Sequence, residues 1–170
     1  MKKAFSGTIV VLLSIVLITP GAAVSPKNPY GTATIDPAAP NEIILTISKG
    51  SQKVEFAYPR LLKLRHSTIS IYEPFLKKRQ SFTVIRLQTL FNFVGIAGSD
   101  KVVTKALNDY IFTAKASDFL KTQGYLAIKR DGAPIPYDQG GPIRIIFPDD
   151  SKWSKNLDAW NWSLFTISVK

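Results

Sequence analysis

Apolar and β-branched residues recur along this chain in short runs, many of which alternate with polar residues. A period of two, with Val, Ile, Thr and aromatic residues enriched, is typical of β-strands. The turn residues Lys49-Gly50-Ser51 predict a hairpin between the first two strands, and Asp131-Gly132 predicts a second hairpin turn. The predicted strands are Glu42–Ser48, Lys53–Tyr58, Ser67–Tyr72, Phe82–Ile85, Lys101–Ala106, Tyr110–Ala114, Tyr125–Lys129, Ile143–Phe147 and Ser163–Val169.

Helical spacing of apolar residues is confined to short segments. Pro59–Leu64 begins with a proline that suits a first helical turn, and Leu87–Ile96 places its apolar residues three and four positions apart. Ala116–Leu120 predicts a third short helix with Ser117 as its N-cap, whereas Glu73–Gln80 is interpreted as a polar, basic connection. Many strands with two or three short helices predict a single β-rich α+β domain.

The first residues have the pattern of a targeting segment. Two lysines precede the apolar run Ala4–Thr19, and small residues follow it, so we expect a signal peptide at residues 1–23 with cleavage after Ala23. A retained membrane anchor is the alternative, although the run is shorter than the roughly 20 residues that span a bilayer. Residues 24–41, rich in Pro, Gly, Ala and Thr, predict an extended leader, and residues 42–170 the domain.

Composition narrows the possible functions. The chain contains no cysteine, which excludes disulfides, a thiolate nucleophile and a thiolate metal ligand. It carries 22 Lys and Arg against 12 Asp and Glu, and loss of Lys2 and Lys3 with the signal peptide changes this to 20 against 12, or +8. This balance favours anionic partners. Nucleic acid is not expected, because no nucleic-acid motif is present and the chain is predicted to be exported, most simply to a bacterial periplasm.

Few residues offer catalytic chemistry. His66 is the only histidine, and no G-x-S-x-G motif or nearby acid supports a catalytic triad around it. One histidine without a thiol also argues against a zinc site. The adjacent carboxylates Asp149 and Asp150 are more typical of a solvated loop than of an acid/base pair.

Residues suited to ligand binding are concentrated near the C-terminus. Gly140-Gly141 allows close backbone approach and exposed N–H donors, and Arg144 offers a planar set of donors. The glycines equally predict a tight turn into a strand. Trp153, Trp160 and Trp162 offer flat faces for stacking, with burial in the core as the alternative. Trp160 and Trp162, two positions apart, are expected on the same side of a strand.

Five segments in a fixed order resemble a known family. They are ALNDY (106–110), ASDF (116–119), LAIKRDGAPIP (126–136), DQGGPIRIIFP (138–148) and WSLFTISV (162–169). Together they resemble the oxidoreductase molybdopterin-binding domain, which has the sulfite-oxidase-type fold, and most closely its small exported members. The resemblance therefore implies this β-rich fold for residues 42–170.

The resemblance also shows what this chain lacks. Enzymes of this family hold molybdenum with a cysteine thiolate in a region corresponding to residues 72–76, and no cysteine stands there. Where they tend to have His-Gly-x-Pro-x-Arg and Lys-Trp, this chain has Gln139-Gly140-Gly141-Pro142-Ile143-Arg144 and Asn161-Trp162. Without the thiolate, a molybdenum cofactor would be poorly anchored. Cysteine-less relatives are thought to be periplasmic pterin-binding proteins, some of them partners of membrane sensors that control cyclic diguanylate turnover.

From the resemblance we expect a periplasmic, non-catalytic protein that binds a pterin or molybdopterin-like ligand without cysteine-ligated molybdenum. It would report ligand occupancy to a membrane sensor, without stable membrane insertion of its own. One alternative is a molybdopterin-dependent oxidoreductase or electron-transfer subunit, and another is a protein-interaction domain whose cleft is closed. Asn108 with Asp109 forms either part of the site or a structural turn. The expected ligand-binding residues are Arg144, Gln139, Gly140, Gly141, Trp162, Trp160, Tyr72, Phe75 and Asn108.

Overall fold

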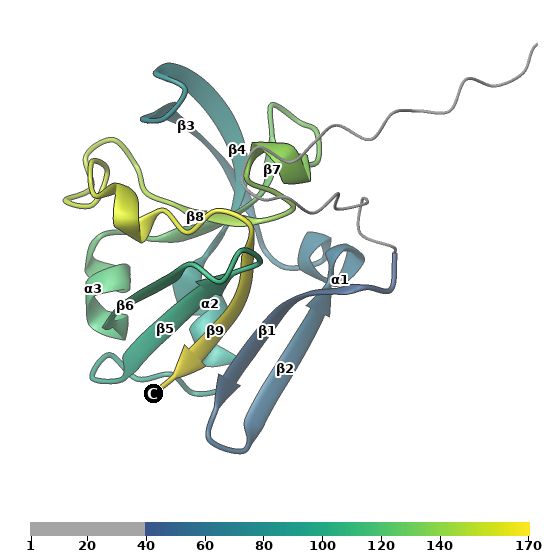
Figure 1. Cartoon of the computed structure of the whole chain (residues 1–170), viewed down its shortest axis with the longest axis vertical. Helices are drawn as coiled ribbons and strands as arrows, with labels where there is room; N and C mark the ends of the chain where they lie inside the picture. The colour runs from purple at the N-terminus through teal and green to yellow at the C-terminus, as the bar shows by residue number, and fades with distance from the viewer. Residues whose placement is uncertain (1–39) are drawn as a thin grey trace, which may run out of the picture.

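The computed structural model describes residues 40–170, which form two packed sheets with short helices (Figure 1). The predicted signal peptide and most of the predicted leader lie outside the described residues. No helix in the described range is long and apolar enough to cross a membrane. The strands are β1 (Ile43–Lys49), β2 (Gln52–Ala57), β3 (Ser67–Glu73), β4 (Lys78–Arg86), β5 (Lys101–Ala106), β6 (Ile111–Lys115), β7 (Tyr125–Arg130), β8 (Arg144–Ile146) and β9 (Leu164–Val169). The α-helices are α1 (Tyr58–Leu62), α2 (Leu87–Asn92) and α3 (Ala116–Lys121), and two 3-10 turns span Tyr137–Gln139 and Leu157–Ala159.

The larger sheet has five strands in the order β2-β1-β9-β5-β6. The β1–β2 hairpin forms as predicted, and Gly50 takes a φ of 56° at its turn. Strand β9 lies parallel to β1 and antiparallel to β5, so the C-terminal strand occupies the middle of this sheet (Figure 1). The predicted β-rich α+β domain is thereby confirmed.

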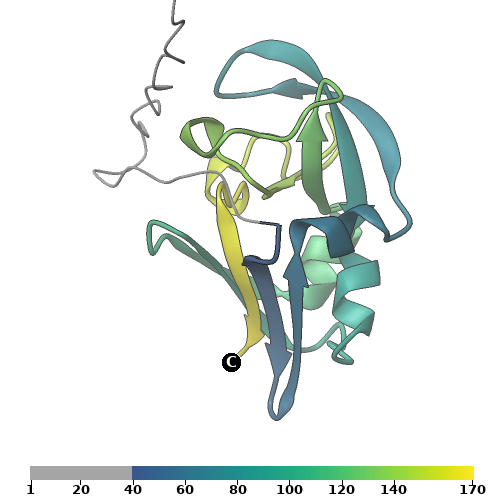
Figure 2. The same ribbon diagram turned by 90° about the vertical axis from the view of Figure 1, so that its right-hand side faces the viewer.

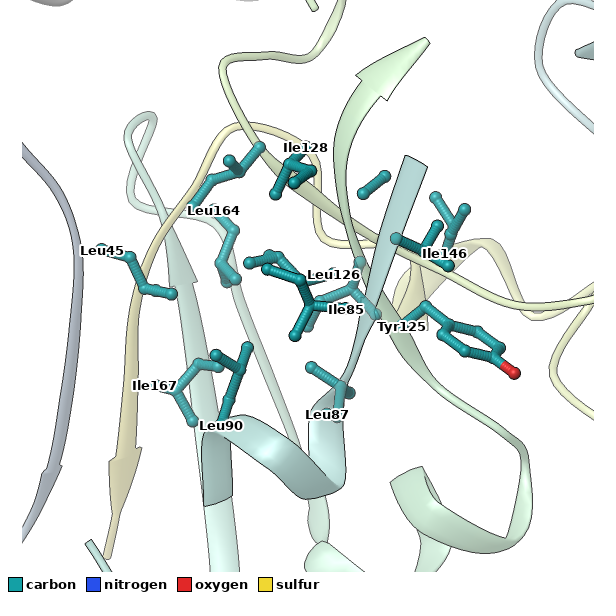
Figure 3. Packing of buried hydrophobic residues seen from close by; sticks show 14 of the residues in the cluster. Leu45, Ile85, Leu87, Leu90, Tyr125, Leu126, Ile128, Ile146, Leu164 and Ile167 are labelled. Carbon is teal, nitrogen blue, oxygen red and sulfur yellow. The ribbon is translucent and has the colours of Figure 1, made fainter. Parts of the chain in front are cut away.

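The smaller sheet has four antiparallel strands in the order β3-β4-β7-β8. Ile85, Leu126 and Ile145 lie in register on neighbouring strands of this sheet, and all three are fully buried. Figure 3 shows Ile85 and Leu126 near Leu45 and Leu164 of the larger sheet. Burying each such side chain contributes about 1.5–3 kcal/mol, so the two sheets are held together mainly by this apolar layer.

The helices cover the core where the sheets leave it open. Leu87, Leu90 and Phe91 of α2 are buried, and Leu87 and Leu90 point toward Ile85 and Ile167 (Figure 3). Helix α2 ends at Asn92 rather than at the predicted Ile96, because Gly95 takes a left-handed φ of 66° and Ile96 N–H closes the helix end by donating to Phe91 O at 3.0 Å.

The prediction for residues 73–80 was wrong over much of its length. We interpreted this basic segment as a connection, but Glu73 ends β3, and β4 begins at Lys78 rather than at Phe82. Pairing with β3 explains the difference, because the backbone N–H and C=O groups of residues 78–81 are satisfied by a neighbouring strand whatever the side-chain pattern.

Two local predictions were also wrong. Ser117 does not cap α3, whose N-cap is Lys115; instead Ser117 N–H donates to Gly98 O at 2.9 Å. Asp131-Gly132 makes the predicted tight turn, with φ values of 51° and 82°, but it is followed by only an isolated bridge from Arg130 to Ala133. The chain then continues without a strand, through the 3-10 turn at Tyr137–Gln139, until β8 begins at Arg144.

Candidate functional site

A buried arginine marks the outer face of the four-stranded sheet, the face opposite the one that carries Ile85, Leu126 and Ile145. Arg144 on β8 pairs with Ala127, which pairs with Val84, and Phe82 lies two residues from Val84 on the same side of β4. The Arg144 side chain is fully buried, with its guanidinium carbon 4.9 Å from the centre of the Phe82 ring and 4.8 Å from the Trp162 ring. A cation between two aromatic faces gains electrostatic stabilisation, which is larger when water is excluded.

The carboxylate nearest this arginine was not among the predicted site residues. Glu73, the last residue of β3, is fully buried, and its Oε1 lies 3.9 Å from Arg144 Nη2. Its Oε2 accepts a hydrogen bond of 2.5 Å from Leu76 N–H. A signal for Glu73 was present in the sequence, because the alternation of Ser67–Tyr72 continues to it and places it on the same side as Ile69 and Ile71. A carboxylate that continues an apolar stripe requires a buried partner.

Trp162 is partly buried and contacts three of its neighbours in the site. Arg144 lies over its ring, and the Phe75 ring meets it edge-on, with the ring centres 4.3 Å apart and the planes at 62°. Gly140 lies against the indole so closely that a Cβ built there would be 2.8 Å from Trp162 Cε3. The structure therefore brings four predicted site residues together around one indole.

The predicted backbone donors are engaged within the protein. Gln139 N–H and Gly141 N–H both donate to Pro136 O, at 3.0 and 2.9 Å, and Gly140 N–H donates to Tyr137 O at 3.2 Å. A Cβ at Gly141 would lie 1.9 Å from Ile135 O, so only glycine fits there. Residues 139–141 therefore form the tight turn before the strand that was the alternative to a ligand-binding role for Gly140-Gly141. The Gln139 side chain accepts a hydrogen bond from the Arg130 guanidinium.

Trp160 lies in the core rather than beside Trp162. It is 3% exposed, its Nε1–H donates to Trp153 O at 3.1 Å, and its ring packs against Phe147. The expectation that Trp160 and Trp162 share one side of a strand was wrong, because both precede β9 in a loop. Between them, buried Asn161 anchors this loop through hydrogen bonds from its Nδ2 to Thr104.

Tyr72 and Asn108 lie at the edges of the site. Tyr72 is exposed, since it points to the opposite side of β3 from Glu73, and its backbone N–H donates to Asp149 Oδ1 at 2.7 Å. Asn108 lies in the β5–β6 turn, where its Oδ1 accepts from Tyr110 N–H, which fits the structural-turn alternative. This turn is linked to the site by backbone, because Leu107 N–H donates to Ser163 O and Ser163 N–H donates to Gly140 O.

Asp149 ties the loop after β8 to the β3–β4 hairpin. It accepts from Tyr72 N–H and forms an ion pair of 2.7 Å with Arg79. Desolvation by itself raises the pKa of Asp149, but the hydrogen bond from Tyr72 N–H and the pairing with Arg79 outweigh it and hold the pKa below its ordinary value. Asp149 therefore remains charged as a structural tie rather than acting as a general acid.

Other sources of chemistry are weak in the described part of the chain. His66 is exposed, and its Nδ1 lies 2.8 Å from Leu64 O. Residues 40–170 contain no group of three or more His, Asp or Glu side chains placed to hold a metal ion. The Glu73–Arg144 pair beside Trp162 is therefore the candidate site, because it is an ion pair whose two side chains are fully buried.

Comparison with known proteins places this fold. A search of curated proteins gives no match. Among solved structures, the sulfane dehydrogenase SoxCD from Paracoccus pantotrophus matches with a TM-score of 0.62 at 12% identity, over 81% of this chain. This chain corresponds to only 40% of that longer one, and the likeness shows the fold alone. The family model described as the oxidoreductase molybdopterin binding domain matches residues 73–160, more than half of the chain, so the protein belongs to that family.

Proposed function

We propose that this protein is a non-catalytic, periplasmic pterin-binding protein that reports ligand occupancy to a membrane sensor, such as one controlling cyclic diguanylate. The observation that carries the proposal is the buried Glu73–Arg144 pair against Trp162, in a member of a molybdopterin-binding family that has no cysteine. The arginine and the tryptophan of the family pattern are present as Arg144 and Trp162, whereas its histidine, its lysine and the thiolate that would make the site a metal centre are not.

The residues present do not fit the metal of the family's cofactor. The chain has no cysteine, and the described residues offer no cluster of metal-ligating side chains. Within residues 72–76, where the family resemblance expects the thiolate, the buried side chain is Glu73, which faces Arg144. One carboxylate already engaged by an arginine is a poor substitute for a sulfur ligand. We therefore derive no redox step for this protein.

The charges favour an uncharged ring over a phosphate-bearing ligand. Glu73 already supplies a negative charge 3.9 Å from Arg144. A ligand phosphate bound at Arg144 would lie close to that carboxylate, and the two negative charges would repel each other where little water screens them. A neutral reduced pterin avoids this cost and offers amide and amine groups that hydrogen-bond to either charge.

Phe75 occupies the position against Trp162 where a flat ligand would stack. It lies in the turn between β3 and β4 and is 44% exposed, so it can move away more readily than the buried Arg144 or Gly140. We propose that the pterin replaces Phe75 against the indole. A stacked ring with several polar contacts supports micromolar affinity, about −8 kcal/mol.

Calorimetric titration with tetrahydrobiopterin, a neutral reduced pterin, tests the proposal. We expect saturable binding that weakens at least about tenfold in Trp162→Ala, because an aromatic contact contributes about 0.5–1.5 kcal/mol beyond its buried area. Phe75→Ala is expected to bind more tightly, because the ligand no longer competes with the phenyl ring. Phe93→Ala is the matched control, since Phe93 is 40% exposed and lies in the α2–β5 connection. Parent affinity in both Trp162→Ala and Phe75→Ala would refute this site.

A closed interaction domain is a second candidate, supported by the three groups that pack against the Trp162 ring. It predicts no heat of binding and no tryptophan quenching with any pterin, in the parent or in Phe75→Ala. Mass spectrometry of small molecules released from natively purified protein separates it from pterin binding. Metal analysis of the same sample tests the oxidoreductase alternative, because molybdenum near one atom per chain would overturn the non-catalytic proposal.

A further inference from the structure

The distal half of the β3–β4 hairpin extends beyond the rest of its sheet. β3 pairs with β4 from Ser67 to Glu73, whereas β7 reaches β4 only between Phe82 and Arg86. The hairpin is therefore two-stranded toward its turn, and it projects at one end of the molecule in both ribbon views (Figures 1 and 2). We call residues 72–79 the hairpin tip.

Apolar side chains are concentrated at this hairpin tip. Tyr72, Phe75 and Leu76 are 49%, 44% and 47% exposed, and they fall within five consecutive positions. Single exposed apolar residues are ordinary, but three together on a projecting turn indicate a contact surface. Their backbone is held in place, because Asp149 accepts from Tyr72 N–H and Glu73 accepts from Leu76 N–H.

Uncompensated positive charge lies beside these apolar side chains. Lys77 and Lys78 are exposed, and neither forms an ion pair with another residue of the described chain. Arg79 is paired with Asp149, and the only carboxylate within the hairpin tip, Glu73, is fully buried. The hairpin tip therefore presents apolar groups and cations together, without an exposed acidic side chain.

We propose that the hairpin tip binds the surface of an anionic lipid bilayer, with Leu76 in the interfacial region and Lys77 and Lys78 at the headgroups. Apolar side chains with neighbouring lysines suit this interface, because the lysine stems lie along apolar surface while the ammonium groups reach phosphate. A narrow convex turn is less suited to a stable protein interface, which buries about 800 Å² on each partner. The net charge expected after signal cleavage, 20 Lys and Arg against 12 Asp and Glu or +8, adds long-range attraction. This inference does not depend on pterin binding.

Co-sedimentation with lipid vesicles tests the proposal. Phosphatidylcholine vesicles containing about one third phosphatidylglycerol are compared with pure phosphatidylcholine vesicles. The full chain is used throughout, so any contribution of residues 1–39 is common to all variants. We expect the parent to bind the anionic vesicles more strongly, with the difference falling as salt is added.

Two variants of the hairpin tip and two matched controls decide the outcome. Leu76→Ser and the double variant Lys77→Glu/Lys78→Glu are each expected to lower partitioning to anionic vesicles by about tenfold. Leu157→Ser is the apolar control, since Leu157 is 44% exposed outside the hairpin tip. Lys101→Glu/Lys115→Glu is the charge control, because these exposed lysines are cross-strand neighbours on the larger sheet.

The comparison between tip and control variants gives a clear result in either direction. Parent-like binding by the tip variants, or equal losses in the control variants, would overturn the proposal. Absence of phosphatidylglycerol-dependent binding in the parent would do the same and would leave a protein partner as the occupant of the hairpin tip.

All four sets of substitutions are on exposed side chains, and a thermal melt of each variant verifies folding. Because Lys78 pairs in register with Glu73 of the proposed pterin site, pterin affinity is measured in parallel in Lys77→Glu alone. It is expected to stay within about twofold of the parent, so failure of one proposal is distinguishable from failure of the other.

Discussion

Both faces of the four-stranded sheet bury apolar side chains, but the outer face also buries a pair of charges. The inner face, toward the larger sheet, carries Ile85, Leu126 and Ile145, whereas the outer face carries Arg144 between Phe82 and Trp162, with Glu73 at its edge. Apolar stabilisation of the inner face is spread over many similar contacts. On the outer face two charges depend on each other, because either one alone would be buried without compensation. This dependence makes the outer face the more specialised of the two, and the following substitutions test it.

The largest effect is expected for breaking the buried ion pair. Arg144→Ala leaves the Glu73 carboxylate buried beside a cavity, so we expect the free energy of unfolding to fall by about 3–5 kcal/mol. Arg144→Met combined with Glu73→Leu removes both charges and is expected to recover most of that loss. Urea denaturation of the three proteins measures the difference. A double variant as unstable as Arg144→Ala would show that the pair does not account for the effect.

Truncation of an apolar side chain of the larger sheet, within the core that the inner face covers, is expected to cost somewhat less. Ile167 on β9 is fully buried between neighbouring strands, and Ile167→Ala should lower the free energy of unfolding by about 2–4 kcal/mol through lost apolar burial and the cavity left behind. Ser168→Ala, at the next position and partly exposed, serves as its control. No second substitution in the apolar core should restore stability in the way expected for the ion pair, since no single core residue depends on Ile167 alone.

A comparison of alanine substitutions at Gly140 and Gly132 separates the cost of packing against Trp162 from the cost of backbone strain. Gly140 and Gly132 have nearly the same φ, 83° and 82°, but a Cβ at Gly140 would meet Trp162 at 2.8 Å, whereas nothing lies within 4 Å at Gly132. Gly132→Ala is expected to cost about 1–2 kcal/mol, from the left-handed backbone alone. Gly140→Ala should cost about 1–3 kcal/mol more and should shift tryptophan emission. Equal melting temperatures for the two variants would mean that the contact with Trp162 is easily relaxed.

The smallest effect is expected for the tie between the hairpin and the outer loop. Because the folded-state pKa of Asp149 is lowered, its contribution to stability is present above the unfolded-state pKa and is lost as pH falls through the folded-state value. Asp149→Asn should therefore lower stability at neutral pH and leave it nearly unchanged in acid. The Arg79 and Asp149 side chains are 58% and 41% exposed, so we expect less than about 1 kcal/mol. Thermal melts of parent and variant from acid to neutral pH check this, and a constant difference across pH would contradict it.

Much of the fold could be predicted from local patterns. Nine strands and three short helices were expected in the described range, and each corresponds to an observed element, because alternation, apolar spacing and turn residues act over a few positions. The errors concern segments whose structure depends on a distant partner. Residues 78–81 are a strand because β3 pairs with them, and α3 begins at Ala116 because carbonyls of residues 98–100 accept its first amides.

The candidate site was predicted in part. Arg144, Trp162, Gly140 and Phe75 do converge, although the sequence separates Phe75 from Trp162 by most of the domain. Trp160, by contrast, is a core residue, and the backbone donors of residues 139–141 bond within the protein. The assignment of a pterin to this site remains a prediction.

The sequence by itself determined the β-rich α+β domain, its family and the absence of a thiolate, because these follow from residue types and their order. Only the tertiary structure decided that Glu73 is the counter-charge of Arg144, that Phe75 covers Trp162, and that Trp160 does not share their site. These are contacts between side chains far apart in the chain, which depend on how two sheets and two long loops pack in space. Local spacing limits which residues can lie on one face of a strand, but only packing brings that face against its partner.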